Sequence, residues 1–190
     1  MKPARTPHEV RIIGGQWKRT KLPVVDAPGL RPTPDRVRET LFNWLGQDLE
    51  GWRCLDAYAG SGALGFEAAS RGADAVVLVE RDQRLAHGLR AVQQRLKADM
   101  VRIEAADALA WMARCAPDSF ELVFIDPPFD ANVFEPALKA AARLVVPDGF
   151  IYLESDRAFD EATLGPGWRL HRHGKAGAVH YHLIQRGTPG

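Results

Sequence analysis

The chain has 190 residues, of which 46% are hydrophobic and 26% are charged, and its formal net charge is +1. This length fits one α/β domain with a small appendage, and the composition is that of a soluble globular protein. The sequence has no apolar run near 18 residues and no signal-peptide pattern, which excludes a membrane span and favours a cytoplasmic protein without a membrane partner. Cys54 and Cys115 lack metal-ligand spacing and suit a reducing compartment, so we expect two core cysteines and no metal site.

Positive charge is concentrated at the front of the chain. Residues 1–40 contain nine Lys or Arg against four Asp or Glu, so this segment carries +5 and the other 150 residues carry −4. Such a surface, with an aromatic residue among the cations, favours contact with a nucleic-acid backbone. The alternative is a solvated basic tail. The residues expected to contact nucleic acid are Arg11, Trp17, Lys18, Arg19, Lys21, Arg31, Arg36 and Arg38.

The first predicted element is a small β-hairpin. Two short apolar runs, 10–13 and 21–24, are separated by a segment that contains two glycines. We expect residues 1–32 to form a basic arm that carries this hairpin, and residues 33–190 to form one globular domain.

A helix is predicted next. Thr33 is expected as its N-cap, and Pro34 suits the first helical position. From Val37 onward the apolar residues share one face, which places Arg36 and Arg38 on the other faces, near the predicted ligand site.

A glycine-rich turn follows the first predicted strand of the main sheet, which begins near Cys54. Gly60, Gly62 and Gly65 satisfy the G-x-G-x-x-G fingerprint of dinucleotide-binding turns. Glycines let the backbone approach a ligand closely, and the following helix offers free N–H donors. Asp56, four residues before the first glycine, would repel a pyrophosphate and attract an ammonium group. S-adenosylmethionine carries an ammonium group and no phosphate, so the motif favours this cofactor over NAD; the alternative for Asp56 is a cap of the turn.

The rest of the chain alternates between short apolar strands and amphipathic helices, which is the pattern of a doubly wound α/β fold. The tail instead has two alternating segments, 168–173 and 179–184, that predict an antiparallel hairpin. We therefore expect a mostly parallel, seven-stranded Rossmann-like sheet with an antiparallel C-terminal hairpin, as in class I S-adenosylmethionine-dependent methyltransferases and unlike most dehydrogenases. The other expected strands cover 75–80, 101–104, 120–126 and 150–154, and the helices cover 82–97, a segment from Asp107, and 133–144.

Acidic residues end several of these strands, at the edge where open α/β sheets bind ligands. Glu80 lies twenty residues after Gly60 and can accept the hydroxyl groups of an adenosine ribose. Asp107 can accept a hydrogen bond from an adenine amino group; the alternative is a helix N-cap, and one residue can do both. The expected cofactor-binding residues are Asp56, Gly60, Ser61, Gly62, Glu80, Arg81, Asp107 and Ala108.

The most specific motif is Asp126-Pro127-Pro128-Phe129, at the end of the fourth strand. Two prolines remove two N–H donors, so a carboxylate and a backbone carbonyl can hold the hydrogens of an aromatic amine and direct its lone pair to a methyl group. Phe129 offers a stacking face for the base. An acceptor-only carboxylate favours guanine mildly over adenine. The alternative is a simple turn.

Five segments, 11–17, 29–33, 35–45, 59–65 and 126–129, together closely resemble the bacterial 16S ribosomal RNA guanine-N2 methyltransferase D family. The resemblance covers nearly the whole chain, including the segment 170–172 and the strand around Tyr181. It implies that S-adenosylmethionine is the methyl donor and that the target is the N2 atom of guanine 966 of 16S rRNA, in an assembled or assembling small ribosomal subunit.

The resemblance also implies residue roles. It assigns the base-holding positions to Asp126, Pro127 and Phe129. The methionine-side turn maps to Asp56, Gly60 and Gly62, and the adenosine contacts map to Glu80 and Asp107. The sequence departs from the family pattern at 57–58, which changes no assigned role, and its histidines around 171–182 are unusually numerous.

Three other interpretations stay open at this point. An adenine-N6 or cytosine-N4 methyltransferase acting on DNA is the nearest, although the chain shows no separate target-recognition domain. An NAD-dependent oxidoreductase is disfavoured by Asp56 and by the motif at 126–129. An RNA-binding ribosome-assembly factor without catalysis is the third.

Overall fold

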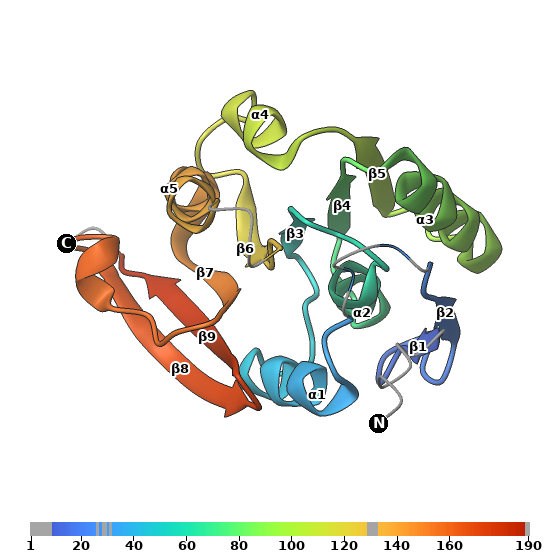
Figure 1. Cartoon of the computed structure of the whole chain (residues 1–190), viewed down its shortest axis with the longest axis horizontal. Coiled ribbons are helices and arrows are strands. Elements are labelled where there is room, and N and C mark those ends of the chain that lie inside the picture. The colour runs from blue at the N-terminus through green and yellow to red at the C-terminus, as the bar shows by residue number, and fades with distance from the viewer. Residues whose placement is uncertain (1–8, 26, 28–29, 31, 129–132, 189–190) are drawn as a thin grey trace.

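The computed structural model of the protein describes residues 9–25, 27, 30, 32–128 and 133–188. A seven-stranded sheet lies at its centre (Figure 1). The strands are β1 (Glu9–Arg11), β2 (Lys21–Pro23), β3 (Arg53–Asp56), β4 (Ala75–Glu80), β5 (Val101–Ala105), β6 (Phe120–Ile125), β7 (Val145–Ser155), β8 (Trp168–Ala176) and β9 (Val179–Arg186). The helices are α1 (Asp35–Trp44), α2 (Ala63–Ser70), α3 (Gln83–Leu96), α4 (Ala108–Ala113) and α5 (Phe134–Leu144), with a 3-10 turn, η1 (Glu161–Thr163).

The strand order in the large sheet is β5-β4-β3-β6-β7-β9-β8. Strands β3 to β7 pair in parallel, whereas β9 is antiparallel to both β7 and β8. The chain runs outward from β3 to β5 and then returns to place β6 on the other side of β3. The predicted parallel sheet with an antiparallel C-terminal hairpin is therefore confirmed, and the switch between β3 and β6 marks the expected ligand edge.

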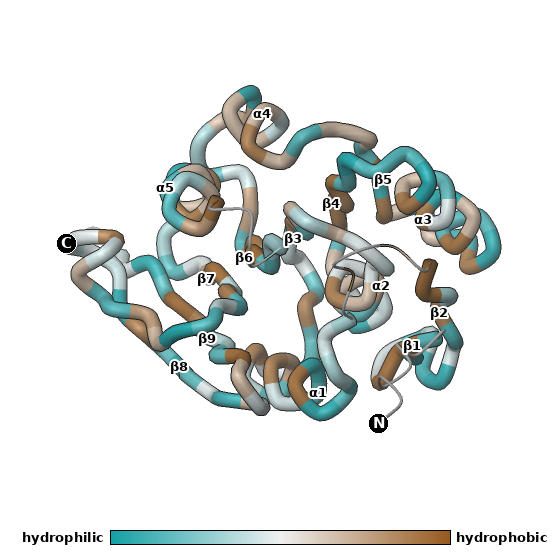
Figure 2. Tube along the Cα trace, in the orientation of Figure 1, coloured by the Kyte–Doolittle hydropathy of each residue, from teal (hydrophilic) through white to brown (hydrophobic). Residues whose placement is uncertain are grey.

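Both faces of the parallel strands are covered by helices, which explains why the central strands β4 and β6 are mainly apolar. Buried residues of α1, α2 and α3 pack in one cluster, and those of α4 and α5 pack in a second cluster against the opposite face (Figure 1). Figure 2 shows hydrophobic residues on the central strands and hydrophilic residues on the outer turns of α3. The core thus holds the carboxyl ends of β3, β4, β6 and β7 in fixed register.

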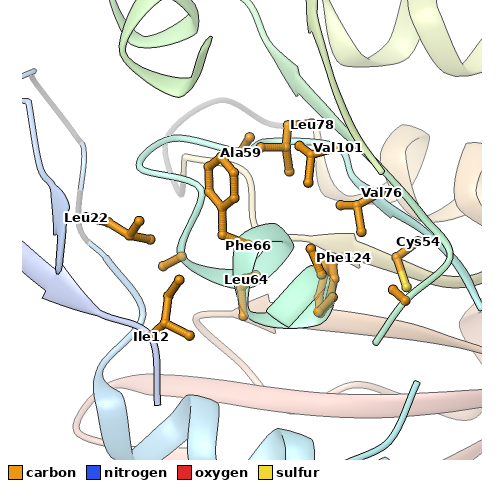
Figure 3. Packing of buried hydrophobic residues seen from close by; sticks show 14 of the residues in the cluster. Ile12, Leu22, Cys54, Ala59, Leu64, Phe66, Val76, Leu78, Val101 and Phe124 are labelled. Atoms are coloured by element: carbon orange, nitrogen blue, oxygen red, sulfur yellow. The ribbon is translucent and has the colours of Figure 1, made fainter. Parts of the chain in front are cut away.

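The hairpin of β1 and β2 is docked on α2. Ile12 and Leu22 are fully buried and point toward Leu64 and Phe66 (Figure 3). The backbone of Gly15 approaches α2 so closely that a Cβ atom there would lie 1.9 Å from the carbonyl oxygen of Ser70. The predicted hairpin exists, and its apolar side chains belong to the same buried cluster as α1, α2 and α3.

One residue expected on the nucleic-acid surface lies in the interior. Arg38 has no exposed surface, and its guanidinium donates hydrogen bonds to Glu67 Oε1 (3.2 Å) and to the carbonyl oxygens of Arg11 (2.8 Å) and Thr33 (3.1 Å). Glu67, also fully buried, accepts from the backbone N–H of Ile13 at 2.8 Å. The prediction that Arg38 contacts RNA is wrong because its charge is neutralised inside the protein, where it holds the hairpin against the domain.

The start of α1 also differs from the prediction. The helix begins at Asp35 with Pro34 as its N-cap, and no side chain caps it. The hydroxyl of Thr33 donates instead to Glu154 Oε1, at 3.0 Å. This long-range partner competes with local capping and draws the segment before α1 to the end of β7.

The predicted strand at 150–154 is the C-terminal half of a longer strand, β7. Phe120 pairs with Val145 and Leu122 pairs with Phe150, so the register between β6 and β7 shifts between these two pairs. The strand β7 therefore begins directly after α5. In the part of the chain that the structure describes, no helix is both long enough and apolar enough to cross a membrane.

Candidate active site

The glycine turn connects β3 to α2 at the switch point of the sheet. Gly62 has φ +82° and ψ +10°, a left-handed conformation that glycine adopts without strain, and it is the N-cap of α2. A Cβ atom at Gly65 would lie 2.0 Å from Leu78 of β4, so this glycine lets α2 pack directly on the sheet. Gly60 also has a positive φ, +57°, and a Cβ there would lie 2.8 Å from Leu30. The turn therefore brings its backbone and the N-terminus of α2 close to the strand ends.

Asp56 lies beneath this turn. Its side chain is almost fully buried, and Oδ2 accepts a hydrogen bond from the N–H of Gly65 at 3.1 Å. Burial, with the negative charges of Glu80 and Glu154, raises the pKa of Asp56 to about 7, although the N–H of Gly65 opposes this shift. Asp56 thus supports the turn, as the alternative interpretation proposed, and it keeps a carboxyl group close to the ligand edge.

Glu80 connects the end of β4 to the glycine turn. Oε2 accepts from the N–H of Gly60 at 3.0 Å, and Oε1 accepts from the N–H of Asp82 at 3.1 Å. Each carboxylate oxygen has a second lone pair, so Glu80 can still accept two hydroxyl hydrogens. Its place beside Gly60 matches the position predicted for a ribose contact.

Asp107 caps α4 and lies at the next strand end. Its Oδ2 accepts from the N–H of Ala110 at 3.0 Å, while Ala108 is buried and Arg81 is exposed. Burial and the negative charge of Asp107 raise the pKa of Tyr58 to about 12, against the influence of Arg81, so these three side chains face one rim of the site. The N-cap interpretation is therefore confirmed for Asp107, and its outer carboxylate oxygen stays exposed.

Asp126 follows β6 on the other side of the switch point. It is partly buried, Pro127 is buried and Pro128 is exposed, whereas Phe129 lies outside the described residues. Glu154 hydrogen-bonds to Asp126, and burial together with the negative charge of Glu154 raises the pKa of Asp126 well above its ordinary value. The two carboxyl groups therefore lie in contact at the carboxyl edge of the sheet.

Sequence reasoning missed three neighbours of Asp126. Oε1 of Glu154, which is 6% exposed, accepts hydrogen bonds from Tyr152 Oη (2.6 Å) and Thr33 Oγ1 (3.0 Å). The available signal was the acid at the end of an apolar strand, which is the same signal that identified Asp56 and Glu80. Because Ile125 pairs with Leu153, Glu154 lies directly beside Asp126.

The basic residues of the arm fall into two groups. Arg36, Lys18 and Arg19 are exposed, whereas Trp17 is half-buried. Two others are exposed and carry surface ion pairs, Arg11 with Asp35 and Lys21 with Glu9. Arg31 lies outside the described residues, and Arg38 is buried, as described above.

The tail histidines gather on one face of β8 and β9. The rings of His173, His180 and His182 are nearly parallel, and their closest nitrogens lie within 4.8 Å of one another. His182 Nδ1 is 3.0 Å from the carbonyl oxygen of Leu153, and its Nε2 accepts from the N–H of Phe159 at 3.0 Å. Lone pairs in parallel ring planes do not meet at one point, and both nitrogens of His182 are already used, so we assign this group a structural role.

The site residues fit S-adenosylmethionine better than a dinucleotide. The strand ends supply the carboxyl groups of Asp56, Glu80 and Asp107, which favour an ammonium group and hydroxyl donors over a pyrophosphate. Gly60 and Gly62 have to be glycine in this packing, because a Cβ atom would lie 2.8 Å from Leu30 and 2.6 Å from Phe66, respectively.

Comparison with known proteins agrees with this geometry. A family model described as "Conserved hypothetical protein 95" matches residues 10–185. Ribosomal RNA small subunit methyltransferase D of Escherichia coli K12 is 42% identical over 184 residues, which cover 96% of this chain and 92% of that protein. The Haemophilus influenzae protein of the same name is 40% identical over 194 residues, which cover 97% of this chain and 100% of that protein. The chain belongs to the small subunit methyltransferase D family.

Solved structures extend this assignment. The solved structure of a putative methyltransferase from Escherichia coli superposes on the present structure with a TM-score of 0.83 at 42% identity. The match covers 95% of this chain and 99% of that chain. A Thermus thermophilus 16S rRNA N2 G1207 methyltransferase, solved with AdoMet and guanosine, has a TM-score of 0.72 at 22% identity. This match covers 94% of this chain and 49% of that chain. The second match shows a shared fold, and the first, at 42% identity, supports the predicted methyltransferase architecture.

Proposed function

We propose that this enzyme transfers a methyl group from S-adenosylmethionine to the exocyclic N2 atom of guanine 966 of 16S rRNA, within the small ribosomal subunit in the cytoplasm. The observation that carries the proposal is the Asp126-Pro127 segment after β6, which lies across the switch point from the glycine turn, in a chain of this family.

The cofactor-binding residues would act as acceptors and spacers. Glu80 would hold the ribose hydroxyl groups, and the exposed oxygen of Asp107 would accept from the adenine amino group. Asp56, with Gly60 and Gly62, would accommodate the amino-acid end. When bound, S-adenosylmethionine supplies an electrophilic methyl group on a positively charged sulfur.

Asp126 and the carbonyl of Pro127 would hold the N2 amino hydrogens of guanine. The lone pair of this amine is delocalised into the base, so fixing both hydrogens rotates it toward the incoming methyl group. Phe129 would stack on the base. Because N2 is paired or stacked in folded RNA, the guanine must leave its stack to enter the site.

The exposed cations of the arm would bind the RNA backbone. Arg11, Lys18, Arg19, Lys21 and Arg36 lie on or beside the hairpin that is docked on α2. Phosphate contacts orient an RNA without reading its sequence, so they would position the target nucleotide over the strand ends.

The test is transfer of labelled methyl from S-adenosylmethionine to unmodified small subunits, naked 16S rRNA and duplex DNA, with the modified nucleoside identified by mass spectrometry. We expect N2-methylguanosine, formed mainly with subunits. Label in DNA would support the adenine-N6 or cytosine-N4 alternative, and no label on any substrate would contradict the proposal.

A further inference from the structure

We infer that Glu154 is a positioning residue of the reaction: it holds Asp126 in a carboxyl pair at the strand ends, and Asp126 takes up the proton released from N2 during methylation. This inference rests on the proposed function, because it concerns the fate of the proton at the same base. It adds a residue that the motif at 126–129 does not contain.

The register of the sheet fixes the pair. Strands β6 and β7 are parallel, and Ile125 pairs with Leu153. The next residues, Asp126 and Glu154, therefore leave neighbouring strands at the same level of the carboxyl edge. Their side chains lie on the face covered by α1, which is also the face of Phe124 and Tyr152.

Two donors fix the orientation of Glu154. Tyr152 Oη and Thr33 Oγ1 both donate to Oε1, at 2.6 and 3.0 Å. Since Oε1 already accepts two hydrogen bonds, the other carboxyl oxygen is the one available to exchange a proton with Asp126. Tyr152 is fully buried and Thr33 is 4% exposed, so this arrangement excludes water from that side of the pair.

The charges that face the pair make it a suitable acceptor. Asp126 faces Glu154 of β7, Asp56 of β3 and the hydroxyl of Thr33, and Tyr152 faces Glu154, Asp126 and Tyr181 of β9. Burial and the negative charge of Glu154 raise the pKa of Asp126 well above its ordinary value. The Asp126 carboxylate is therefore a better proton acceptor than an ordinary aspartate.

The proposed step balances as follows. The lone pair of N2 forms the bond to the methyl carbon, while the carbon–sulfur bond of S-adenosylmethionine breaks and leaves its electron pair on sulfur. The N–H bond of the now cationic N2 then breaks, and its electron pair stays on nitrogen. The proton goes to the carboxylate of Asp126, which then holds it in the hydrogen bond to Glu154.

Two substitutions test the inference in opposite directions. Glu154→Gln keeps an acceptor for Tyr152 and Thr33 but cannot take up a proton. It also removes a negative charge beside Asp126, so the acidic limb of the single-turnover pH profile should move to lower pH. Tyr152→Phe removes a donor to Glu154, which makes the pair more basic, so the same limb should move to higher pH.

The expected rate effect is moderate because Asp126 remains. In single turnover with unmodified small subunits, Glu154→Gln should lower the rate about 10- to 100-fold, less than the ~10²–10⁴-fold contributed by a complete general base. The KM values for S-adenosylmethionine and for subunits should stay unchanged. Glu121→Gln is the matched control, since Glu121 is a strand glutamate of β6 that pairs with Arg53 at the opposite edge of the sheet.

The outcomes separate the two proposals. If wild type forms N2-methylguanosine and neither variant moves the acidic limb, Glu154 only supports the segment before α1 and the inference is overturned. If Glu154→Gln does not fold, the effect of Tyr152→Phe on the acidic limb tests the inference. A move to higher pH supports it, and no move or a move to lower pH overturns it. If wild type methylates no substrate, the proposed function itself fails.

Discussion

Two buried charge networks in this protein have opposite composition. The first joins Arg38 and Arg71 to Glu67 and fixes the β1–β2 hairpin to the domain. The second places Asp126 beside Glu154 at the ends of β6 and β7. In the first network a cation faces an anion, so the charges can remain buried. In the second, two acidic groups meet, so burial and the negative charge of Glu154 raise the pKa of Asp126. The difference separates a structural network from a chemical one.

The largest expected effect is on the chemical network. Asp126→Ala removes the acceptor that orients the amine, and methyl transfer should fall at least ~10²–10⁴-fold. Methyl transfer is measured in single turnover, and S-adenosylmethionine binding is measured by calorimetry. Folding and cofactor binding should be retained, since Asp126 lies on the base side of the site. A variant with full activity would show that the motif at 126–129 is only a turn.

Breaking the structural network should instead cost stability. Arg38→Met leaves the buried Glu67 with only one of its two cationic partners, Arg71, which we expect to lower the free energy of unfolding by about 3–5 kcal/mol in urea titration. Arg38→Met combined with Glu67→Leu should recover part of this loss, because the fully buried Glu67 carboxylate is removed as well. If Arg38→Met left stability unchanged but weakened subunit binding, Arg38 would belong to the RNA-binding surface after all.

The next expected effect is a loss of stability at Gly65, where α2 packs closely on Leu78 of β4. Gly65→Ala places a methyl group 2.0 Å from Leu78, so α2 must move. We expect a loss of about 1–3 kcal/mol in thermal or urea unfolding. S-adenosylmethionine should also bind more weakly, because the turn moves with the helix. Gly88→Ala is the control, since the nearest atom to its Cβ lies at 3.8 Å.

The exposed arm provides a smaller, salt-dependent effect. Lys18→Ala with Arg19→Ala should raise the KM for subunits several-fold and reduce the slope of affinity against salt by about 2, one for each phosphate that the variant no longer neutralises. S-adenosylmethionine affinity and stability should stay unchanged. An unaltered salt slope would place the RNA surface elsewhere.

The smallest effect concerns His182. Burial lowers its pKa from 6.5 to about 4, although the hydrogen bond to Leu153 opposes this shift. Between these values the unfolded state binds more protons than the folded state, so stability decreases as pH falls from about 6.5 to 4. His182→Asn keeps a donor for Leu153 and cannot take up a proton. The urea midpoint of this variant should therefore change less than that of wild type across this pH range. Parallel pH profiles of the two midpoints would show that protonation of His182 does not affect stability.

The sequence predicted those features that depend on local pattern. Apolar runs and helical periodicity located the strands and helices, and the glycine turn and Asp126-Pro127 lie at the predicted strand ends. Distant partners could not be predicted in the same way. Helical spacing does not reveal that Arg38 meets Glu67, 29 residues away, or that Thr33 donates to Glu154 instead of capping α1. The pairing of Glu154 with Asp126 likewise depends on the register between β6 and β7.

The most direct test of the central claim maps the methyl group on the RNA. Unmodified small subunits are treated with S-adenosylmethionine and either wild type or Asp126→Ala, and the 16S rRNA fragment that contains nucleotide 966 is sequenced by mass spectrometry. We predict one methyl group on N2 of guanine 966 with wild type and almost none with Asp126→Ala. A methyl group at another nucleotide or atom, or equal modification by the variant, would contradict the account.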